Sequence, residues 1–294
     1  MTSTTKSASL KGPTADLPAQ PIRPPQIGNP LMASTAEFPA PSATLEAFGL
    51  KFSAGGAHIS RTIMSAELAL TLAAVPKGSL ADEYRSAVLE RNILGKTTVS
   101  TRQKSFRHLR ELYGMDESVP IFALLRTLDA IDPDSQPLLA FLIAWSKDPL
   151  LRATSNLVLT TGIGDPLGPS ELADGIQSEF PSQYSERSRA TIGRNAASSW
   201  TQSGHLLGRT KKTRQRINPT PAAVTMALFL GSISGYHGTA VFSNPWCRIL
   251  DLDADRAKGF GQDAHRAGLL NLRAVGEVVE ISFPLFAELQ GNAS

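Results

Sequence analysis

The hydrophobic positions along most of the chain recur at helical spacing, and they predict a mainly helical protein. The clearest case is a helix in which Ile192, Ala196 and Trp200 recur every four residues and mark one apolar face. Ser185 is a typical N-cap before this helix, and Gly204 ends it because glycine readily adopts the left-handed conformation found after helices. The other face carries donor side chains: Arg187, Thr191, Arg194 and Ser198.

Similar patterns predict further helices before and after this one. Residues 121–128 and 137–145 are apolar on nearly every side, which is typical of helices buried in a core. Asp148-Pro149 predicts a helix start, because proline is favoured at the first helical position. One additional helix is expected to start with Ile63, Glu67 and Leu70 and to end at Pro76 and Gly78. The others are expected from Asp82 to Leu94, along the stripe Val99, Phe106, Leu109 and Tyr113, from Glu171 to Phe180, from Pro221 to Leu230, and along Ala257, Phe260, Ala264 and Ala267.

Two short hairpins interrupt the helical pattern. His205-Leu206-Leu207 predicts a strand that is followed by a basic tip and return strand over 208–216. Together with the two helices before it, this hairpin has the outline of a winged helix, in which the second helix enters a groove and the wing contacts phosphates. A second hairpin is expected from Leu269–Arg273 and Glu277–Phe283. The predicted fold is therefore mainly α, with a helical bundle-like core and winged-helix elements.

Composition divides the chain into four parts. Residues 1–48 contain eight of the 20 prolines and many Ser, Thr and Ala, so we expect a disordered tail that buries too little apolar surface to fold. Residues 49–168 are expected to form an N-terminal helical domain, residues 169–218 the winged-helix element, and residues 219–294 a C-terminal region of helices and a hairpin.

Positive charge is concentrated in one segment. The whole chain has a formal net charge of +3, yet residues 185–217 hold eight Lys and Arg against one acidic residue, Glu186. A second segment, residues 91–110, holds six Lys and Arg and no acid. Such concentration is typical of a surface that binds a phosphate backbone and releases its counterions. The alternative is that both segments are ordinary solvated surface.

These observations predict contacts with double-stranded DNA, mostly to phosphate. Base edges in the major groove would be read from the helix by Arg187, Thr191, Arg194 and Asn195. The complete set of expected DNA-binding residues is Arg187, Arg189, Thr191, Arg194, Asn195, Arg209, Lys211, Lys212, Arg214 and Arg216, with Lys96, Arg102, Lys104 and Arg107 as a second contact.

Motifs of enzymes and metal sites are not evident, so we expect no catalytic residues, no cofactor and no metal. The sequence lacks a Walker A loop, a GxSxG elbow, an HExxH pair and a CxxC pair, and its five histidines are widely separated. Asp251-x-Asp253-x-Asp255 departs from a calcium loop because Arg256 replaces the required glycine. Scattered acids leave a metal-dependent nuclease as an open alternative. One cysteine and no long apolar segment favour a cytoplasmic protein with no membrane partner.

Several short segments resemble a known family. Ser53-Ala54-Gly55-Gly56, Arg91-Asn92-Ile93-Leu94, Asp148-Pro149-Leu150-Leu151-Arg152 and Ser198-Ser199-Trp200, in that order, resemble the BrxA family of bacteriophage exclusion (BREX) defence systems. The resemblance extends through Gly204-His205-Leu206 to Gly268-Leu269-Leu270 and covers the chain from about Phe52 onward. It omits the proline-rich N-terminal part and depends on the order of the segments.

The resemblance implies a non-enzymatic, mostly helical accessory protein with winged-helix character that binds double-stranded DNA beside other proteins of its defence system. The same family has been compared with an RNA-binding antitermination factor, so RNA stays open as a ligand. A third possibility is a protein–protein scaffold within the defence complex, in which case reversing the charge of the wing would have no effect.

Overall fold

The computed structural model describes residues 1–2, 38–275 and 278–291, and residues 36–294 form one compact unit. The predicted disordered tail falls largely on residues 3–37, outside the described part. Its predicted end at residue 48 is wrong, because α1 (Ala43–Phe48) is a helix whose cap Ser42 accepts a hydrogen bond from the Leu45 amide at 3.2 Å. Leu45 and Phe48 are buried, and their burial stabilises a segment that composition alone predicts to be unfolded.

The unit is mainly helical, as the sequence predicts. A helical turn, η2 (Ala57–Ile59), precedes the first long helices. The N-terminal and central helices are α2 (Ser65–Ala74), α3 (Ala81–Leu89), α4 (Val99–Tyr113), α5 (Pro120–Ile131), the turn η3 (Pro133–Ser135), α6 (Gln136–Lys147), α7 (Pro149–Arg152), α8 (Ser155–Thr160), α9 (Pro169–Glu179) and α10 (Glu186–Gln202). The C-terminal helices are α11 (Pro221–Ile233), η4 (Gly238–Ser243), α12 (Pro245–Ile249), α13 (Ala254–Arg266), η5 (Pro284–Phe286) and α14 (Ala287–Gly291).

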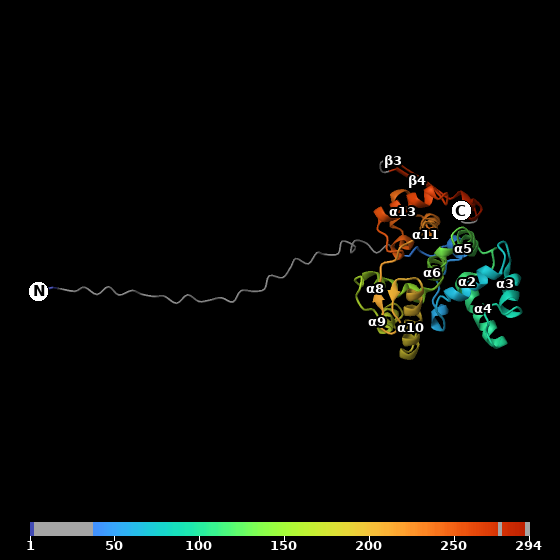
Figure 1. Cartoon of the computed structure of the whole chain (residues 1–294), viewed down its shortest axis with the longest axis horizontal. Helices are drawn as coiled ribbons and strands as arrows, with labels where there is room; N and C mark the ends of the chain where they lie inside the picture. The colour runs from blue at the N-terminus through green and yellow to red at the C-terminus, as the bar shows by residue number, and fades with distance from the viewer. Residues whose placement is uncertain (3–37, 276–277, 292–294) are drawn as a thin grey trace. The chain divides into compact units, whose positions relative to one another are not determined.

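Helix α6 lies at the centre of the core. Every residue from Leu138 to Ser146 is buried, as expected for a helix that is apolar all round. Helices α2, α4, α5, α7 and α11 all pack against it. Figure 1 shows α6 near the middle of the unit, with α2–α4 on one side, α8–α10 on the other, and α11, α13 and the second hairpin above.

Aromatic side chains join the three folded parts that the sequence predicts. The ring of Phe141 on α6 lies 4.7 Å from that of Trp200 on α10, and Trp145 on α6 lies 6.0 Å from Trp246 on α12. Trp246 Nε1 also donates to the Ser146 hydroxyl at 2.8 Å. Residues 49–168, 169–218 and 219–294 therefore all contribute side chains to one core.

Both predicted hairpins are present. The basic one consists of β1 (Leu206–Leu207) and β2 (Thr213–Arg214), and the C-terminal one of β3 (Asn271–Val275) and β4 (Val278–Ser282); both are antiparallel. A third extended segment, residues 164–167, pairs with the outer edge of β2. The Leu167 amide donates to the Lys212 carbonyl at 3.0 Å, and the Arg214 amide donates to the Asp165 carbonyl at 2.9 Å. The chain before α9 thus joins the hairpin that follows α10.

No helix in the described ranges combines the length and apolarity needed to cross a membrane.

Candidate nucleic-acid interface

Helix α10 carries the site that the sequence predicts, and its start is fixed by the predicted cap. The hydroxyl of Ser185 accepts a hydrogen bond from the Ser188 amide at 3.2 Å. The predicted apolar face is buried, and Trp200 Nε1 donates to the Thr154 hydroxyl at 2.8 Å. Gly193 brings α10 close to α9, since a β-carbon there would lie 2.3 Å from the carbonyl oxygen of Pro169. The opposite face of α10 is left toward solvent.

That outer face presents two arginines. Arg187 and Arg194 are exposed, and Arg194 donates to the hydroxyl of half-buried Thr191 at 2.9 Å. The other two predicted residues of α10 serve the fold instead. Arg189 donates to the Tyr184 carbonyl at 2.7 Å, and Asn195 donates its amide to the His58 carbonyl at 2.9 Å. These bonds leave Arg187 and Arg194 as the exposed cations of α10.

The tip between β1 and β2 presents a second set of cations. Gly208 permits the tip, because its φ of +116° favours glycine and a β-carbon would lie 2.1 Å from the Lys211 carbonyl oxygen. Arg209 and Lys211 are exposed at this tip, and Arg216 is exposed after β2. Lys212 is half-buried: its ammonium donates to Gly208 and Thr201, and burial lowers the pKa of Lys212.

The prediction that Arg214 contacts DNA is wrong. The residue is 1% exposed, and its guanidinium is fully engaged inside the protein. Nε donates to the Val158 carbonyl at 2.9 Å, and the terminal nitrogens donate to the carbonyls of His205 and Gln215 and to the Asp251 carboxylate. The cause is the register of the hairpin: Arg214 pairs with buried Leu206, so both side chains point inward.

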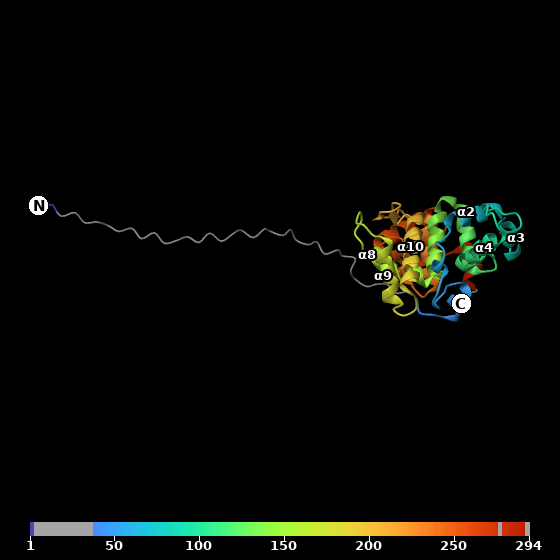
Figure 2. The same cartoon turned by 90° about the horizontal axis from the view of Figure 1, so that it is seen from below.

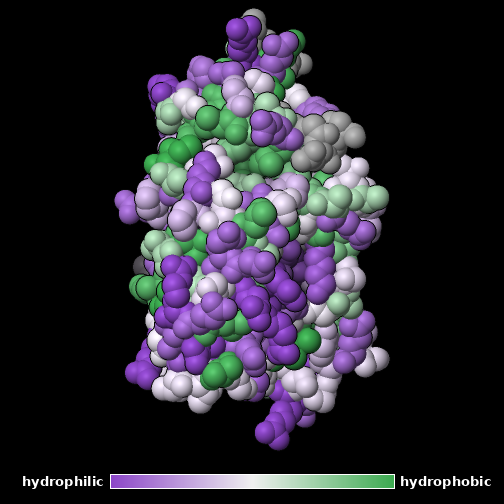
Figure 3. All heavy atoms as spheres, turned by 90° about the vertical axis from the view of Figure 1, so that its right-hand side faces the viewer, coloured by the Kyte–Doolittle hydropathy of each residue, from purple (hydrophilic) through white to green (hydrophobic). Residues whose placement is uncertain are grey.

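The second basic element consists of α4 and the residues before it. Only some of its predicted residues are available for binding DNA. The ammonium of Lys96 pairs with Glu67 at 3.1 Å, and Arg102 donates to the Leu89 carbonyl at 2.6 Å, so these two predicted residues hold the fold together. Lys104 and Arg107 are exposed. In Figure 3, hydrophilic side chains gather over the lower half of the face, the level at which α3 and α4 lie in Figure 1.

Residues 57–65 hold α10 on one side. Asn195 of α10 bonds to the His58 carbonyl, and further along the helix the hydroxyl of Ser199 accepts the Ile63 amide at 3.0 Å. The segment and the helix therefore run in the same direction.

The same segment contacts α4 on its other side. His108 Nε2 lies 3.3 Å from the Ser60 hydroxyl, and the Tyr113 hydroxyl donates to the Ile63 carbonyl. The order of these contacts shows that α4 also runs parallel to the segment. Each helix begins nine residues before the first of these hydrogen bonds to the segment, at Glu186 in α10 and at Val99 in α4.

At a rise of about 1.5 Å per residue, each helix thus extends about 13 Å toward its N-terminus from that contact. Both N-terminal halves therefore reach the same end of the unit, which is the lower edge in Figure 1 and faces the viewer in Figure 2. Sequence charge alone does not reveal this placement, because it depends on the bonds to residues 57–65.

A Ser–His–Asp array, which sequence reasoning missed, fixes this arrangement. His58 Nδ1 lies 2.7 Å from the Asp148 carboxylate, and His58 Nε2 lies 2.8 Å from the Ser199 hydroxyl. Since a carboxylate only accepts, Nδ1 of His58 carries the proton. Gly56 permits the close approach, because a β-carbon there would lie 2.0 Å from Asp148 Oδ1. Glycine next to glycine before His58 is the one local signal of this close contact.

The array joins parts of the chain rather than forming an open site. His58, Asp148 and Ser199 are each at most 1% exposed. Burial alone would raise the pKa of Asp148, but the charge and hydrogen bonds of His58 and the backbone amide of Leu150 hold it below its usual range. A nucleophilic serine needs a path for substrate, and Ser199 is enclosed in the middle of α10. The array ties α10, α7 and η2 together.

The acidic motif around residues 251–255 also has structural roles. Asp251 pairs with Arg214, and its second carboxylate oxygen accepts the Ile217 amide at 3.1 Å. Asp253 caps α13 by accepting the Arg256 amide at 2.8 Å. Within the described ranges, no three His, Cys, Asp or Glu side chains are grouped as they would be around a metal ion.

Comparison with known proteins adds no relative: no model of a known protein family matches this chain, and no curated protein matches its sequence.

Proposed function

We propose that this protein binds double-stranded DNA, mostly through the phosphate backbone, as a non-enzymatic accessory protein of a BREX-type phage defence system. The observation that carries the proposal is the connectivity around α9 and α10. The order is extended segment, helix, helix, strand, strand, and the strand that follows the tip lies between the other two. This order supports the winged-helix interpretation, in which α10 would enter a groove and residues 208–212 would be the wing.

The exposed cations support the same reading. Arg187 and Arg194 on α10 and Arg209 and Lys211 on the wing are directed to solvent, while neighbouring cations are used internally. Long, exposed Lys and Arg side chains suit phosphate contacts, which position a protein without reading sequence. The N-terminal end of α4, with Lys104 nearby, would add a second contact, because a helix N-terminus favours an anion.

Duplex DNA is favoured over single-stranded RNA by the state of the aromatic residues near α10. Recognition of unstacked bases needs exposed aromatic faces. Trp200 is buried against Phe141, and the ring of Tyr184 packs edge-on against Phe180 at 6.0 Å. A role in binding is favoured over catalysis by the enclosure of the Ser–His–Asp array.

The assignment to a defence system depends on the resemblance of the short segments. Contacts between these segments support treating them as one unit. Gly56 lies against Asp148, and the hydroxyl of Ser199 lies within hydrogen-bond distance of His58. The partners proposed in addition to DNA are other proteins of the same system.

A salt titration of duplex DNA binding tests the proposal. If about six phosphates are neutralised, log Kd should change with log salt with a slope of magnitude near 5. The double variant Arg209→Glu, Lys211→Glu should weaken binding and reduce that magnitude by about 2, since two contacts are lost. The matched control is Lys77→Glu, Arg273→Glu, which makes the same charge change at two exposed sites away from α10 and the wing.

Loss of binding in the wing variant with little change in the control would support the proposal. Equal losses in both variants would indicate general charge attraction, and no binding of the wild type at low salt would refute DNA binding. A structured RNA in parallel measures the alternative directly, because an RNA-binding module should prefer it over the duplex.

A further inference from the structure

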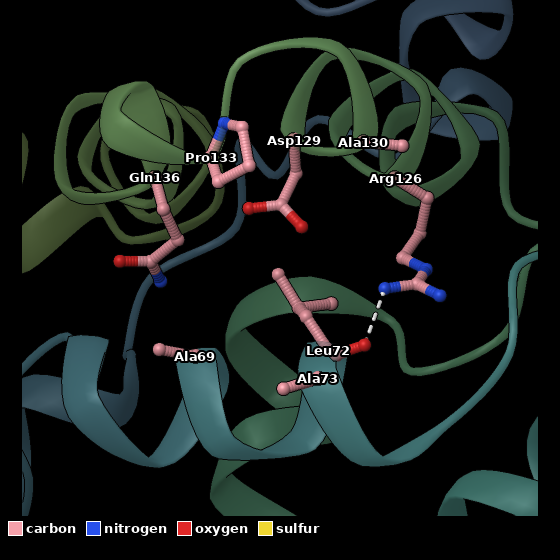
Figure 4. A pocket seen from close by; sticks show the side chains of 8 residues that line it. All are labelled: Ala69, Leu72, Ala73, Arg126, Asp129, Ala130, Pro133 and Gln136. Atoms are coloured by element: carbon pink, nitrogen blue, oxygen red, sulfur yellow. Dashed lines mark hydrogen bonds between the residues drawn. The ribbon is translucent and has the colours of Figure 1, made fainter.

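A pocket of about 380 Å³ lies between α2, α5 and the start of α6, and none of the proposed DNA-binding residues lines it. Its α2 wall consists of Ala69, Leu72 and Ala73, and its other side includes Arg126 and Asp129 of α5. Figure 4 shows these side chains around the opening, with Asp129 directed into it. The volume lies near the lower end of the range for small-molecule sites, so a ligand with few atoms would fill it.

The arginine of this pocket is already neutralised. Arg126 donates to the carbonyls of Leu72 at 2.9 Å and Val75 at 2.7 Å, and so pairs two carbonyls at the C-terminal end of α2. Its Nε donates to the Glu117 carboxylate at 3.3 Å. Arg126 therefore caps α2 and balances one acid, and it is 5% exposed.

The aspartate of this pocket is not neutralised. Among the hydrogen bonds and ion pairs of the described residues, none involves the Asp129 carboxylate, which is half-buried beside alanine and leucine side chains. Burial raises the pKa of Asp129, and the charge of Arg126 opposes that rise. Because the charges of Arg126 and Glu117 cancel, the net formal charge of Arg126, Glu117 and Asp129 together is −1.

We propose that this pocket binds the cationic end of an organic amine or guanidine, with Asp129 as the charge partner and Ala69 and Ala73 packing against its alkyl stem. A carboxylate flanked by methyl groups suits such a group, because the cation forms charge-assisted hydrogen bonds while its methylenes cover apolar surface. The ligand chemistry has two sources, a free polyamine-like molecule or a Lys or Arg side chain of a partner protein. The site is independent of DNA binding.

The test uses the full-length protein labelled with ¹³C at the aspartate carboxyl groups. Agmatine is the probe for a free ligand, and the peptide acetyl-Ala-Arg-Ala-amide is the probe for a side chain. We expect at least one probe to shift the Asp129 signal saturably and to lower its titration midpoint. Asp129→Asn should weaken binding at least tenfold, whereas Asp134→Asn, the same charge change at an exposed site in η3, should not.

A second variant fills the pocket without altering charge. We expect the fold to tolerate Ala69→Leu because Ala69 is exposed on α2, and the variant should block the probe while Asp129 remains ionisable. Binding of agmatine alone would identify a free molecule as the source, and binding of the peptide would identify a side chain. The proposal is overturned if neither probe saturates, if Asp129→Asn binds as tightly as the wild type, or if both asparagine variants weaken binding equally.

Discussion

Replacing Arg214 with methionine should destabilise the protein strongly and leave the DNA-binding surface itself intact. The variant keeps an apolar stem of similar length but removes the guanidinium that bonds to Val158, His205 and Gln215. It also removes the cation that pairs with Asp251, whose side chain is 11% exposed. The expected loss is therefore one of folding and not of phosphate contacts.

The magnitude follows from the burial of the pair. Removing one partner of a buried ion pair leaves the other charge unbalanced and costs about 3–5 kcal/mol. For a protein of this size, that change corresponds to a decrease in Tm of roughly 10 °C. Adding Asp251→Asn should restore part of the loss, because the amide oxygen can still accept the Ile217 amide while no charge is buried.

Urea unfolding monitored by circular dichroism measures this loss, and the salt titration of DNA binding is repeated on the folded variant. We expect a lower unfolding midpoint for Arg214→Met, a partial recovery in the double variant, and a salt slope equal to that of the wild type. An unchanged unfolding midpoint together with a DNA-binding loss as large as that of Arg209→Glu, Lys211→Glu would refute the structural role of Arg214.

Three further predictions concern the packing and titration of the same region. Gly193→Ala should destabilise the protein by about 1–3 kcal/mol because the added methyl group meets α9. The control Gly259→Ala, at a helical glycine with open space around it, should stabilise the protein by up to about 1 kcal/mol. Equal shifts in the urea unfolding midpoint of the two variants would contradict the close packing of α10 on α9. Burial lowers the pKa of His205 from its ordinary value of 6.5 to about 4. At pH values below 6.5, protons therefore bind preferentially to the unfolded state. The free energy of unfolding of the wild type should fall by about 3 kcal/mol as the pH falls from 7 to 4, and His205→Gln should lack this pH-dependent loss. Parallel curves of stability against pH for the two proteins would argue against this role of His205. Ser199→Ala should cost about 1–3 kcal/mol by breaking the buried array, while Ser198→Ala should be nearly neutral, and calorimetry showing equal Tm values would exclude the array as a tether.

The local pattern determined most of the secondary structure. Ser185 caps the helix that follows it, as its position before an apolar stripe indicates, and both hairpins lie where strand and turn residues predict them. These features depend on neighbours within a few residues, so the sequence contains the information directly. The mainly helical fold follows from the same short-range physics.

Only the tertiary structure decided which cations are available and what lies beside them. Arg214 and Arg209 are equally basic in the sequence, yet strand register buries one and the tip of the hairpin exposes the other. His58, Asp148 and Ser199 are widely separated along the chain and meet only because η2, α7 and α10 pack together. Periodicity describes one element at a time, whereas burial and long-range hydrogen bonds depend on how elements pack, and that packing selects the exposed cations from the charged residues.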